Sequence, residues 1–252
     1  MSGLEAGGRA RVDEQQELRE ELEDTRKLAA EKEQQLERYA ADLRETFKQE
    51  RERAQEVRRS YVATVRALTN AVEARDAYTG KHAERVAAYS LELARIVAPE
   101  LVDDPLSEFG FLLHDVGKVA IPDSVLHKPN PLTREERALI ETHTVIGAQI
   151  IAGIEFLSEA QAVVRHHHER WDGNGYPDGL AGESIPMAAR IFAVADTFDA
   201  LTTDRPYRPA AKIHRAREVI SGEAGKQFDP TVVVAFVEVS DERLLEIRKA
   251  VG

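Results

Sequence analysis

The sequence predicts an all-α protein in which one long helix precedes a helical domain. Residues 9–75 contain no proline or glycine and are rich in Glu, Arg, Gln, Lys and Ala, a composition that favours an uninterrupted helix. Helix-start signals and apolar residues at helical spacing recur through the rest of the chain. A convincing alternating pattern, which would indicate β-strands, does not occur, and residues 232–234 alone are ambiguous.

The composition of the 252-residue chain narrows its functions. A formal net charge of -11 argues against a protein that binds nucleic acid or a membrane surface. The absence of cysteine excludes disulfides, a thiolate nucleophile and cysteine-type zinc sites, and it fits a reducing cytoplasm. Because no apolar run is long enough to cross a bilayer, we expect a cytoplasmic chain with no membrane segment.

The N-terminal region is predicted to form a coiled coil. Residues 1–8 are expected to be disordered, and residues 9–71 are expected to form a signalling and dimerisation helix. Its apolar residues follow a heptad seam through Leu18, Leu22, Ala29, Leu36, Tyr39 and Leu43 and, after a slip in phase at Phe47, through Ala54, Val57, Tyr61 and Leu68. This pattern predicts a parallel homodimer on the order of 100 Å long. The alternative is a single charged helix stabilised by salt bridges between successive turns.

Residues 72–252 are predicted to form the globular domain. Residues 76–80 interrupt the long helix, and Thr79 is placed to cap a helix that carries His82 and ends at Pro99.

Further helices are expected in order at about residues 105–119, 133–151, 159–169, 186–201, 212–221 and 230–251. Thr133 and Glu136 match a capping box, and Pro186 is suited to the first turn of the helix that follows it. Prolines exclude regular structure from residues 121–131.

Seven histidine and aspartate side chains are candidate metal ligands, because they come from at least five predicted helices and several have apolar neighbours. They are His82, His114, Asp115, His143, His167, His168 and Asp196. Burying a carboxylate such as that of Asp196 among apolar side chains is costly unless a metal or another cation compensates its charge. Seven ligands exceed the need of one ion and suit a binuclear centre, in which Asp115 could bridge the two ions.

Each candidate ligand also has a structural interpretation when it is taken alone. His82 could lie on a helix surface, and Asp115 could cap a helix or pair with a cation. Asp196 could pair with Arg190 or Arg205. We prefer the metal centre because all seven residues would otherwise need separate explanations. Two further histidines stand in polar contexts and are predicted to lie on the surface, His127 and His214.

Three consecutive histidines, residues 166–168, lead through Glu169 into a segment with two glycines and a proline, residues 172–177, here named the signature loop. We expect the end of a helix that carries ligands, followed by a constrained loop in which Gly173 and Gly175 adopt backbone angles that other residues resist. Adjacent residues on a helix point about 100° apart, so His166 is expected to be a neighbour of the site rather than a ligand. The alternative is a run of surface histidines.

Several motifs follow one another along the domain. They are His114-Asp115 with Gly117-Lys118, then His167-His168-Glu169, Trp171-Asp172-Gly173, Gly175-Tyr176-Pro177, and Asp196 with Asp204-Arg205-Pro206-Tyr207-Arg208. Together they resemble the HD-GYP phosphodiesterases, a branch of the HD metal-hydrolase superfamily, over about residues 72–239. The resemblance implies an HD-type helical bundle that holds two or three metal ions, usually iron or manganese. It implies hydrolysis of the bacterial messenger cyclic di-GMP to pGpG and often onward to GMP.

The resemblance also implies roles for individual residues. The seven candidate ligands match the family's metal-binding positions, and Asp115 matches the bridging position. Lys118 matches the lysine that touches the scissile phosphate, which makes Lys118 and Asp115 the candidate catalytic residues. Arg205 and Arg208 match positions that hold substrate phosphates, and Tyr176 lies in the signature loop beside the site.

The number of metal ions is predicted from one departure. Family members with a third metal carry a glutamate four residues before the first histidine, and this chain has Tyr78 there. A tyrosine is a poor replacement ligand, so we expect two divalent ions, iron or manganese. Asn174 replaces a common threonine or serine of the signature loop, which is a mild change.

The expected function is metal-dependent hydrolysis of cyclic di-GMP as the output of a dimeric bacterial signalling protein. The ions would supply an activated water, and Lys118 would stabilise the charge that builds on the phosphate. A diguanylate cyclase or another signalling domain is an expected partner at the signature loop. One alternative is a catalytically weak module that binds a cyclic dinucleotide or a partner protein, although no ligand is missing. A hydrolase of nucleotides or alarmones is another, although such enzymes lack these combined motifs.

Overall fold

The computed structural model describes residues 3–75, 81–103, 106–204 and 208–251, and only the backbone of residues 3–15 and 17. Its regular structure is helical, and no β-strand occurs within these ranges. The bridges between described residues are isolated ones, Asp172 with Ala181 and Ala224 with Phe228. The predicted all-α class is therefore confirmed. In the same ranges, no helix combines the length and the apolar character that crossing a bilayer requires.

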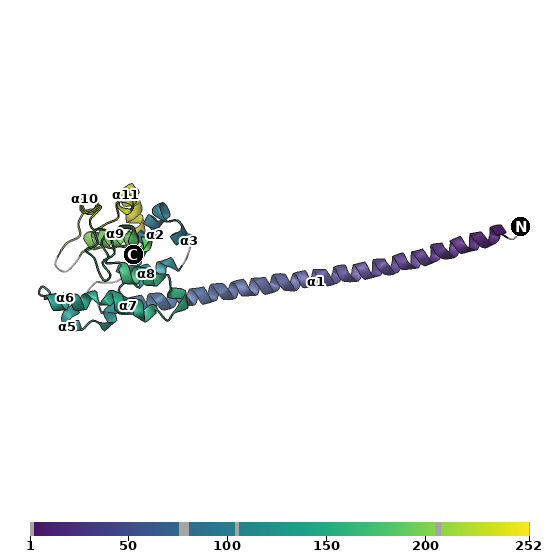
Figure 1. The fold of residues 1–252 in the computed structure, drawn as a ribbon, viewed down its shortest axis with the longest axis horizontal. Helices are drawn as coiled ribbons and strands as arrows, with labels where there is room; N and C mark the ends of the chain where they lie inside the picture. The colour runs from purple at the N-terminus through teal and green to yellow at the C-terminus, as the bar shows by residue number, and fades with distance from the viewer. Residues whose placement is uncertain (1–2, 76–80, 104–105, 205–207, 252) are drawn as a thin grey trace. The chain divides into compact units, whose positions relative to one another are not determined.

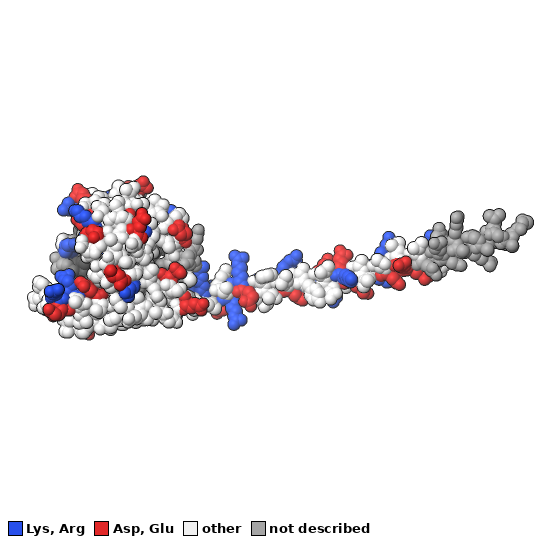
Figure 2. Space-filling model, in the orientation of Figure 1, with Lys and Arg blue, Asp and Glu red and all other residues white. Residues whose placement is uncertain are grey.

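The chain divides by its contacts into two units, residues 1–61 and residues 62–252. Helix α1 (Gly3–Glu73) makes up the described part of the first unit, which confirms the predicted long helix (Figure 1). The seam residues are exposed, with Leu36 and Phe47 each 67% accessible. Basic and acidic side chains are interspersed along α1 (Figure 2). An exposed apolar seam is what one helix of a coiled coil presents when its partner helix is absent. The dimer stays a prediction.

The second unit begins at Val62, ten residues before the predicted domain start at residue 72. The physical reason is that Val65 and Val72, near the end of α1, are buried in the same apolar core as the globular helices. At the other end, α1 starts at Gly3, inside the segment that the sequence analysis placed before the helix.

The second unit consists of short helices. They are α2 (His82–Val97), α3 (Glu100–Asp103), α4 (Ser107–Leu112), η1 (Val116–Ala120), α5 (Asp123–Leu126), α6 (Arg134–Glu141), α7 (His143–Ile151), η2 (Glu155–Leu157), α8 (Ala160–His166), η3 (Gly182–Ser184), α9 (Met187–Thr202), α10 (Ile213–Gly222), α11 (Pro230–Glu238) and α12 (Asp241–Val251), where η marks 3₁₀ helices. Figure 1 shows α5, α6 and α7 at one end of this unit and α10 and α11 at the other.

The core is built around the pair of helices α2 and α9. Helix α2 also packs against α4, α11 and α12, and α9 also packs against α8 and α10. Val86 and Leu93 of α2 and Phe192 and Phe198 of α9 are buried in the common apolar core. Each large apolar side chain that is fully buried stabilises the fold by about 1.5–3 kcal/mol. Because α2 carries His82 and α9 carries Asp196, the packing that forms the core also sets the separation of these two groups.

The helix predicted at residues 105–119 is interrupted. Helix α4 ends at Leu112, a turn follows, and η1 begins at Val116. Glycine and β-branched residues are weak helix formers, and the close packing of η1 on α7 overrides the helical pattern of the sequence. His114 and Asp115 therefore lie in a turn rather than inside a helix.

Two other predicted helices are each divided. Residues 133–151 form α6 and α7, and Thr142 at the junction donates its hydroxyl to the carbonyl of Leu139 (2.6 Å). Residues 230–251 form α11 and α12, because Ser240 accepts from the backbone N–H of Arg243 and caps a new helix. The ambiguous residues 232–234 are helical, in α11.

The predicted helix starts have mixed outcomes. The capping box is confirmed: the N–H of Glu136 donates to the Thr133 hydroxyl (3.2 Å), and the N–H of Thr133 donates to the Glu136 carboxylate (2.8 Å). The loop predicted at residues 121–131 contains the single turn α5, because Pro122 precedes that turn, where a missing N–H costs nothing. The predicted cap Thr79 lies outside the described residues.

A close backbone approach fixes η1 on α7. A Cβ atom added to Gly117 would lie 1.9 Å from the carbonyl oxygen of His143 and 2.6 Å from the backbone nitrogen of Gly147. Real Cβ atoms do not approach backbone atoms so closely. Packing therefore requires glycine at position 117. The close approach of η1 and α7 brings the candidate ligands Asp115 and His143 together.

We predict that Gly117→Ala destabilises the protein by about 1–3 kcal/mol or more, because the added methyl group overlaps backbone atoms that cannot rotate away. Chemical denaturation of both proteins measures the difference. Gly153→Ala is the matched control, since nothing lies within 4 Å of its added Cβ, and its effect should stay within about 0.5 kcal/mol. Equal stability of the two variants would contradict the packing argument.

Candidate metal centre

The candidate ligands lie mostly at helix ends. His82 and His143 are the first residues of α2 and α7, and His114 with Asp115 form the turn between α4 and η1. His167 and His168 follow the last residue of α8, and Asp196 lies inside α9. Helix ends leave side chains free to turn inward, so short elements from distant parts of the chain deliver their ligands to one place.

Five of these seven residues line one cavity of about 270 Å³, and His143 and His167 do not. The side chains of this site that line it are His82, His114, Asp115, Lys118, His168 and Asp196. Thr69, Val72 and Glu73, from the end of α1, form another part of its wall.

Asp115 lies at the middle of the group. One of its carboxylate oxygens is 3.1 Å from Nε2 of His114 and 2.8 Å from Nζ of Lys118. The other oxygen is 3.3 Å from Nε2 of His143. A carboxylate that uses its two oxygens toward different partners has the arrangement that a bridging ligand needs.

The remaining ligands extend from this centre in two directions. One ligand atom from each of His143, His167 and His168 lies within 4.8 Å of the other two. At the opposite side, Nε2 of His82 is 3.4 Å from a carboxylate oxygen of Asp196. The seven residues predicted from the sequence thus form one continuous cluster.

Four of the imidazoles use one nitrogen to orient the ring. Nδ1 donates to a main-chain carbonyl in three of them, His114 to Phe111 (2.9 Å), His143 to Ile140 (2.7 Å) and His167 to Val164 (3.0 Å). His82 donates Nδ1 to the carboxylate of Asp199 (2.8 Å). In a neutral ring with the proton on Nδ1, the lone pair of Nε2 points toward the cluster, which is the arrangement of metal-bound histidines with an outer partner.

Of the structural alternatives, an ion pair does hold for Asp115, which lies 2.8 Å from Lys118, and the pair of Asp196 with Arg190 does not. Arg190 donates to Asp229 (2.6 Å) and to the carbonyl of Ile185, not to Asp196. His127 and His214 are exposed, as predicted.

His166 lies outside the cluster, as expected. Its ring belongs to a second group with Glu169 and Asp178. Glu169 accepts two backbone N–H groups, and Arg165 pairs with Asp178 through two contacts of 2.7 and 2.8 Å. The charges of this group are therefore compensated within the chain.

The carboxylates of the cluster are held in the charged form. Burial raises the pKa of Asp115, but the neighbouring charge of Lys118 and the imidazoles of His114 and His143 outweigh it and keep that pKa well below its usual range. Burial likewise raises the pKa of Asp196, and the hydrogen bond and charge of His82 lower it overall. Both groups present negative oxygen ligands at neutral pH.

The imidazoles fall into two classes. Burial and the neighbouring imidazoles lower the pKa of His168 to about 4 and hold the pKa of His167 well below its usual value, so both rings are neutral at pH 7. Burial also lowers the pKa of His82, but the hydrogen bonds and charges of Asp196 and Asp199 outweigh it and raise the pKa to about 10. A cation at the cluster would take the place of that proton.

The donor set fits divalent metal ions. Neutral imidazole nitrogens and carboxylate oxygens, without sulfur, suit ions such as iron(II), manganese(II) and zinc(II). Two carboxylates and seven ligands in all exceed what one ion requires. Oriented Nε2 lone pairs are the observation that favours metal over a network of hydrogen bonds.

The signature loop lies against the ligand-bearing segment. A Cβ atom on Gly175 would be 2.4–2.6 Å from backbone atoms of residues 168–170, so the close approach, and not a special backbone angle, requires glycine there. Gly173 does adopt the predicted left-handed angle (φ 77°). Tyr176 stacks on His168 with 4.8 Å between ring centroids, and both oxygens of Glu169 accept backbone N–H groups just beyond the loop.

The candidate substrate-binding residues are not all at the cavity. Lys118 lines it, and Tyr176 contacts a ligand ring at its edge. Arg208 is exposed, donates to the carbonyl of Ala200 and is not among the lining residues. Arg205 lies outside the described residues, as does Tyr78.

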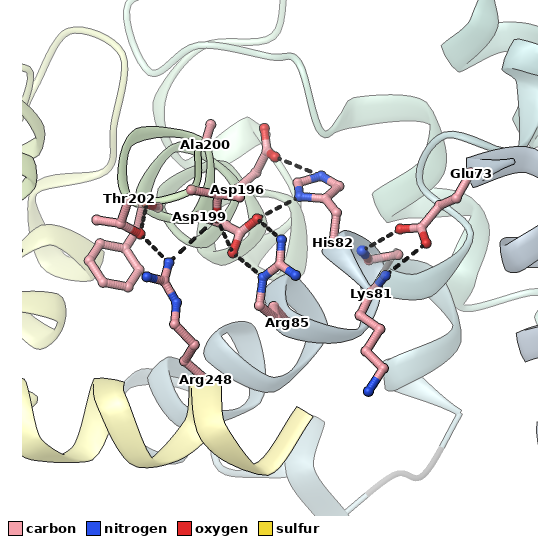
Figure 3. A network of polar contacts seen from close by, with 12 residues as sticks. Glu73, Lys81, His82, Arg85, Asp196, Asp199, Ala200, Thr202 and Arg248 are labelled. Atoms are coloured by element: carbon pink, nitrogen blue, oxygen red, sulfur yellow. Dashed lines mark hydrogen bonds and ion pairs between the residues drawn. The ribbon is translucent and has the colours of Figure 1, made fainter. Parts of the chain in front are cut away.

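The end of α1 contacts two of the ligand-bearing segments, which the sequence analysis did not predict. The hydroxyl of Thr69 donates to the carbonyl of Leu112 (3.2 Å), two residues before His114. The carboxylate of Glu73 accepts the two backbone N–H groups that flank His82, at 3.2 and 2.8 Å (Figure 3). No local sequence pattern announces these contacts, since they join residues distant in the chain.

Arg75 makes a third contact of this kind. Its guanidinium donates to the carbonyls of Val119 (2.6 Å) and Ile121 (3.1 Å) and to the carboxylate of Asp123 (2.8 Å). These groups lie just after Lys118. The three segments that carry His82, His114 and Lys118 are thus all attached to the last turns of α1.

Arg85 and Asp199 were also missed as parts of the site. Figure 3 shows the Asp199 carboxylate between the imidazole of His82 and the guanidinium of Arg85, with Asp196 on the other side of the ring. The available signal was spacing: Arg85 follows His82 by three residues and Asp199 follows Asp196 by three, which places each pair on one helix face.

Residues 66–232 match the family model of the HD domain. Among curated proteins, 3′3′-cGAMP-specific phosphodiesterase 2 of Vibrio cholerae is 41% identical over 177 residues, which are 69% of this chain and 34% of the relative. The cyclic di-GMP phosphodiesterase response regulator RpfG of Xanthomonas campestris pv. campestris is 38% identical over 235 residues, which are 91% of this chain and 57% of the relative. The chain spans less than two thirds of either relative.

A solved structure is also similar. The crystal structure of a cyclic GMP-AMP-specific phosphodiesterase of V. cholerae, V-cGAP3, matches with a TM-score of 0.54 and 24% identity, over 75% of this chain and 52% of that one. At this identity the likeness concerns the fold, and it confirms the predicted helical bundle of HD type.

We predict that the purified chain binds divalent metal and that Asp115→Asn weakens the binding by about 100-fold or more, because the amide loses the charge and one of two oxygens that face three partners. Metal analysis and chelator competition with anaerobically purified protein measure the effect. Asp24→Asn is the matched control, an exposed aspartate of α1 whose substitution should leave metal content unchanged. Equal metal content in all three proteins would contradict the assignment.

Proposed function

Because this chain belongs to the HD domain family, we propose that it is a metal-dependent phosphodiesterase that hydrolyses cyclic di-GMP to pGpG and onward to GMP. The observation that carries the proposal is that five of the seven candidate ligands and Lys118 line a single cavity, with His143 and His167 directly beside His168. The curated relatives, one a cyclic di-GMP and the other a 3′3′-cGAMP phosphodiesterase, support cyclic dinucleotides as the substrate class.

The proposed metal centre holds two ions, iron or manganese, bound by His82, His114, Asp115, His143, His167, His168 and Asp196. Two divalent ions, when bound, would neutralise phosphate charge and lower the pKa of a water. The hydroxide that this water yields at neutral pH can attack phosphorus. Asp115 is positioned to serve both ions, because its oxygens face different imidazoles.

Lys118 acts on the substrate from the cavity wall. Its ammonium lies 2.8 Å from Asp115, which holds it at the cavity, and an ammonium is a donor group that suits a phosphate oxygen. There it stabilises the charge that builds during hydrolysis and delivers a proton to the departing ribose oxygen.

Tyr176 and the two arginines complete the proposed substrate site. Burial raises the pKa of Tyr176, so its hydroxyl stays protonated and can donate a hydrogen bond to a phosphate. Arg205 and Arg208 would bind the second phosphate of a cyclic dinucleotide, for which a planar guanidinium is suited. For Arg208 this requires its side chain to leave the carbonyl of Ala200.

We further propose that the protein is the cytoplasmic output of a dimeric signalling protein. The exposed heptad seam of α1 supports a parallel coiled-coil dimer. The contacts of Thr69, Glu73 and Arg75 with the segments that carry His114, His82 and Lys118 support a route by which a shift of α1 alters the centre. The signature loop remains the proposed contact for a diguanylate cyclase or another signalling domain.

We predict that Lys118→Ala lowers kcat for cyclic di-GMP by about 10²–10³-fold while the metal content stays unchanged, because a charge that acts mainly in the transition state is lost. Chromatography of pGpG and GMP measures the rate. Lys226→Ala is the matched control, an exposed lysine that lies in a turn and should retain full activity.

Three outcomes of this assay would contradict the proposal in different ways. Faster turnover of 3′3′-cGAMP than of cyclic di-GMP would change the substrate. Binding of cyclic di-GMP without turnover by the metal-loaded wild type would favour the alternative of a catalytically weak binding module. Equal kcat of Lys118→Ala and wild type would remove Lys118 from the mechanism.

For the dimer, we predict that the full chain sediments as a dimer and that Leu36→Lys with Leu43→Lys raises its dissociation constant by about 100-fold or more, because two charges enter the apolar seam. Analytical ultracentrifugation measures the constant. Leu28→Lys is the control, because Leu28 is equally exposed but lies off the seam. A monomeric wild-type chain would show that the seam is not a dimer interface.

A further inference from the structure

Asp199 is a buried carboxylate behind the metal centre that the sequence motifs did not assign. It lies on α9, one turn after Asp196, and is 1% exposed. It is not among the residues that line the cavity, so it does not face a substrate. Its oxygens instead accept from Nδ1 of His82 (2.8 Å) and from Nε and Nη2 of Arg85 (2.7 and 3.0 Å) (Figure 3).

His82 differs from the other oriented imidazoles of the site in its partner. His114, His143 and His167 donate Nδ1 to main-chain carbonyls, which carry no net charge. His82 donates to a carboxylate, which makes the opposite nitrogen a stronger ligand than a carbonyl partner does. That nitrogen, Nε2, faces Asp196 at 3.4 Å.

Arg85 fixes the direction of this carboxylate. It stands one turn after His82 on α2, and both of its contacts with Asp199 are within hydrogen-bond distance. A buried Arg–Asp pair adds little to stability compared with apolar residues of the same size, so stability alone does not account for this pair. Here the guanidinium holds the carboxylate so that one oxygen points at the imidazole.

We propose that Asp199, oriented by Arg85, is a positioning residue that holds His82 with its Nε2 lone pair toward the metal centre and thereby sets the affinity for one of the two metal ions. This inference rests on the proposed function in one respect, that His82 is a metal ligand. It adds a residue pair, Asp199 and Arg85, to the machinery of the site.

The test is Asp199→Asn in the full chain. The amide keeps the shape of the carboxylate but leaves one oxygen to serve donors from both Arg85 and His82, so its NH₂ group disturbs the imidazole or the guanidinium. We expect manganese(II) binding, measured by chelator competition, to weaken by about 10–100-fold for one ion and to stay within twofold for the other.

A matched control separates this effect from loss of a buried ion pair as such. Asp229 is 2% exposed, and its carboxylate accepts a hydrogen bond from Arg190 of α9 (2.6 Å). Like Asp199, it is not among the residues that line the cavity. Asp229→Asn should lower the melting temperature and leave both manganese affinities within twofold of wild type. Equal loss of metal affinity in the two variants would overturn the proposal.

A double variant separates positioning from stability. Asp199→Asn with Arg85→Met also removes the guanidinium that has lost its carboxylate at position 199, and it should recover melting temperature. We expect the weakened manganese site to persist, because the carboxylate opposite His82 is still absent. If metal affinity recovers together with melting temperature, the pair has a structural role only.

The result also distinguishes this inference from the proposed function. Wild type that binds no manganese(II) or iron(II) would contradict the metal centre itself. Wild type that binds two ions, with Asp199→Asn binding both equally well, would leave the metal centre in place and overturn the role of Asp199 alone.

Discussion

The charged and polar side chains of the candidate ligands lie within an apolar helical core. Their charges must be compensated there, and this requirement explains much of the second unit. Asp115 and Asp196 would be costly to bury without cations nearby, and His167 stands among fully buried side chains such as Val164 and Phe192. The fold meets this requirement by giving the rings fixed hydrogen-bond partners and by placing Lys118 on Asp115. A metal centre would complete the compensation that the chain alone provides in part.

Short elements and close backbone approaches make this convergence geometrically feasible. Gly117 lets η1 lie directly on α7, and Gly175 lets the signature loop lie directly on the histidine segment. In long helices, neighbouring ligands would point in different directions, because each helical residue is rotated by about 100° from the one before it. Residues at the end of α1 and just after it form hydrogen bonds with the segments that carry His82, His114 and Lys118. The position of these segments therefore depends on the end of the long helix.

The sequence predicted the all-α class, the meeting of the seven candidate ligands and the position of His166 outside their group, because each follows from residue chemistry or from local period. It did not predict the turn at residues 113–115, which depends on the packing of Gly117 against a helix some thirty residues further along the chain. It did not indicate a role for Asp199, since the partners of that residue, His82 and Arg85, are more than one hundred residues away in the chain. Local sequence patterns predict the helices and the candidate ligands. The groups that orient these ligands are brought to them by the tertiary fold, and local patterns do not predict them.

The central claim is that the seven ligands hold two metal ions, and anomalous diffraction from crystals of the manganese-loaded protein tests it most directly. The account predicts two anomalous peaks about 3.5–4 Å apart, with Asp115 between them and His82 and His168 among the surrounding side chains. Peaks confined to the group of His166, Glu169 and Asp178, or an absence of peaks at Asp115 in fully loaded crystals, would contradict it.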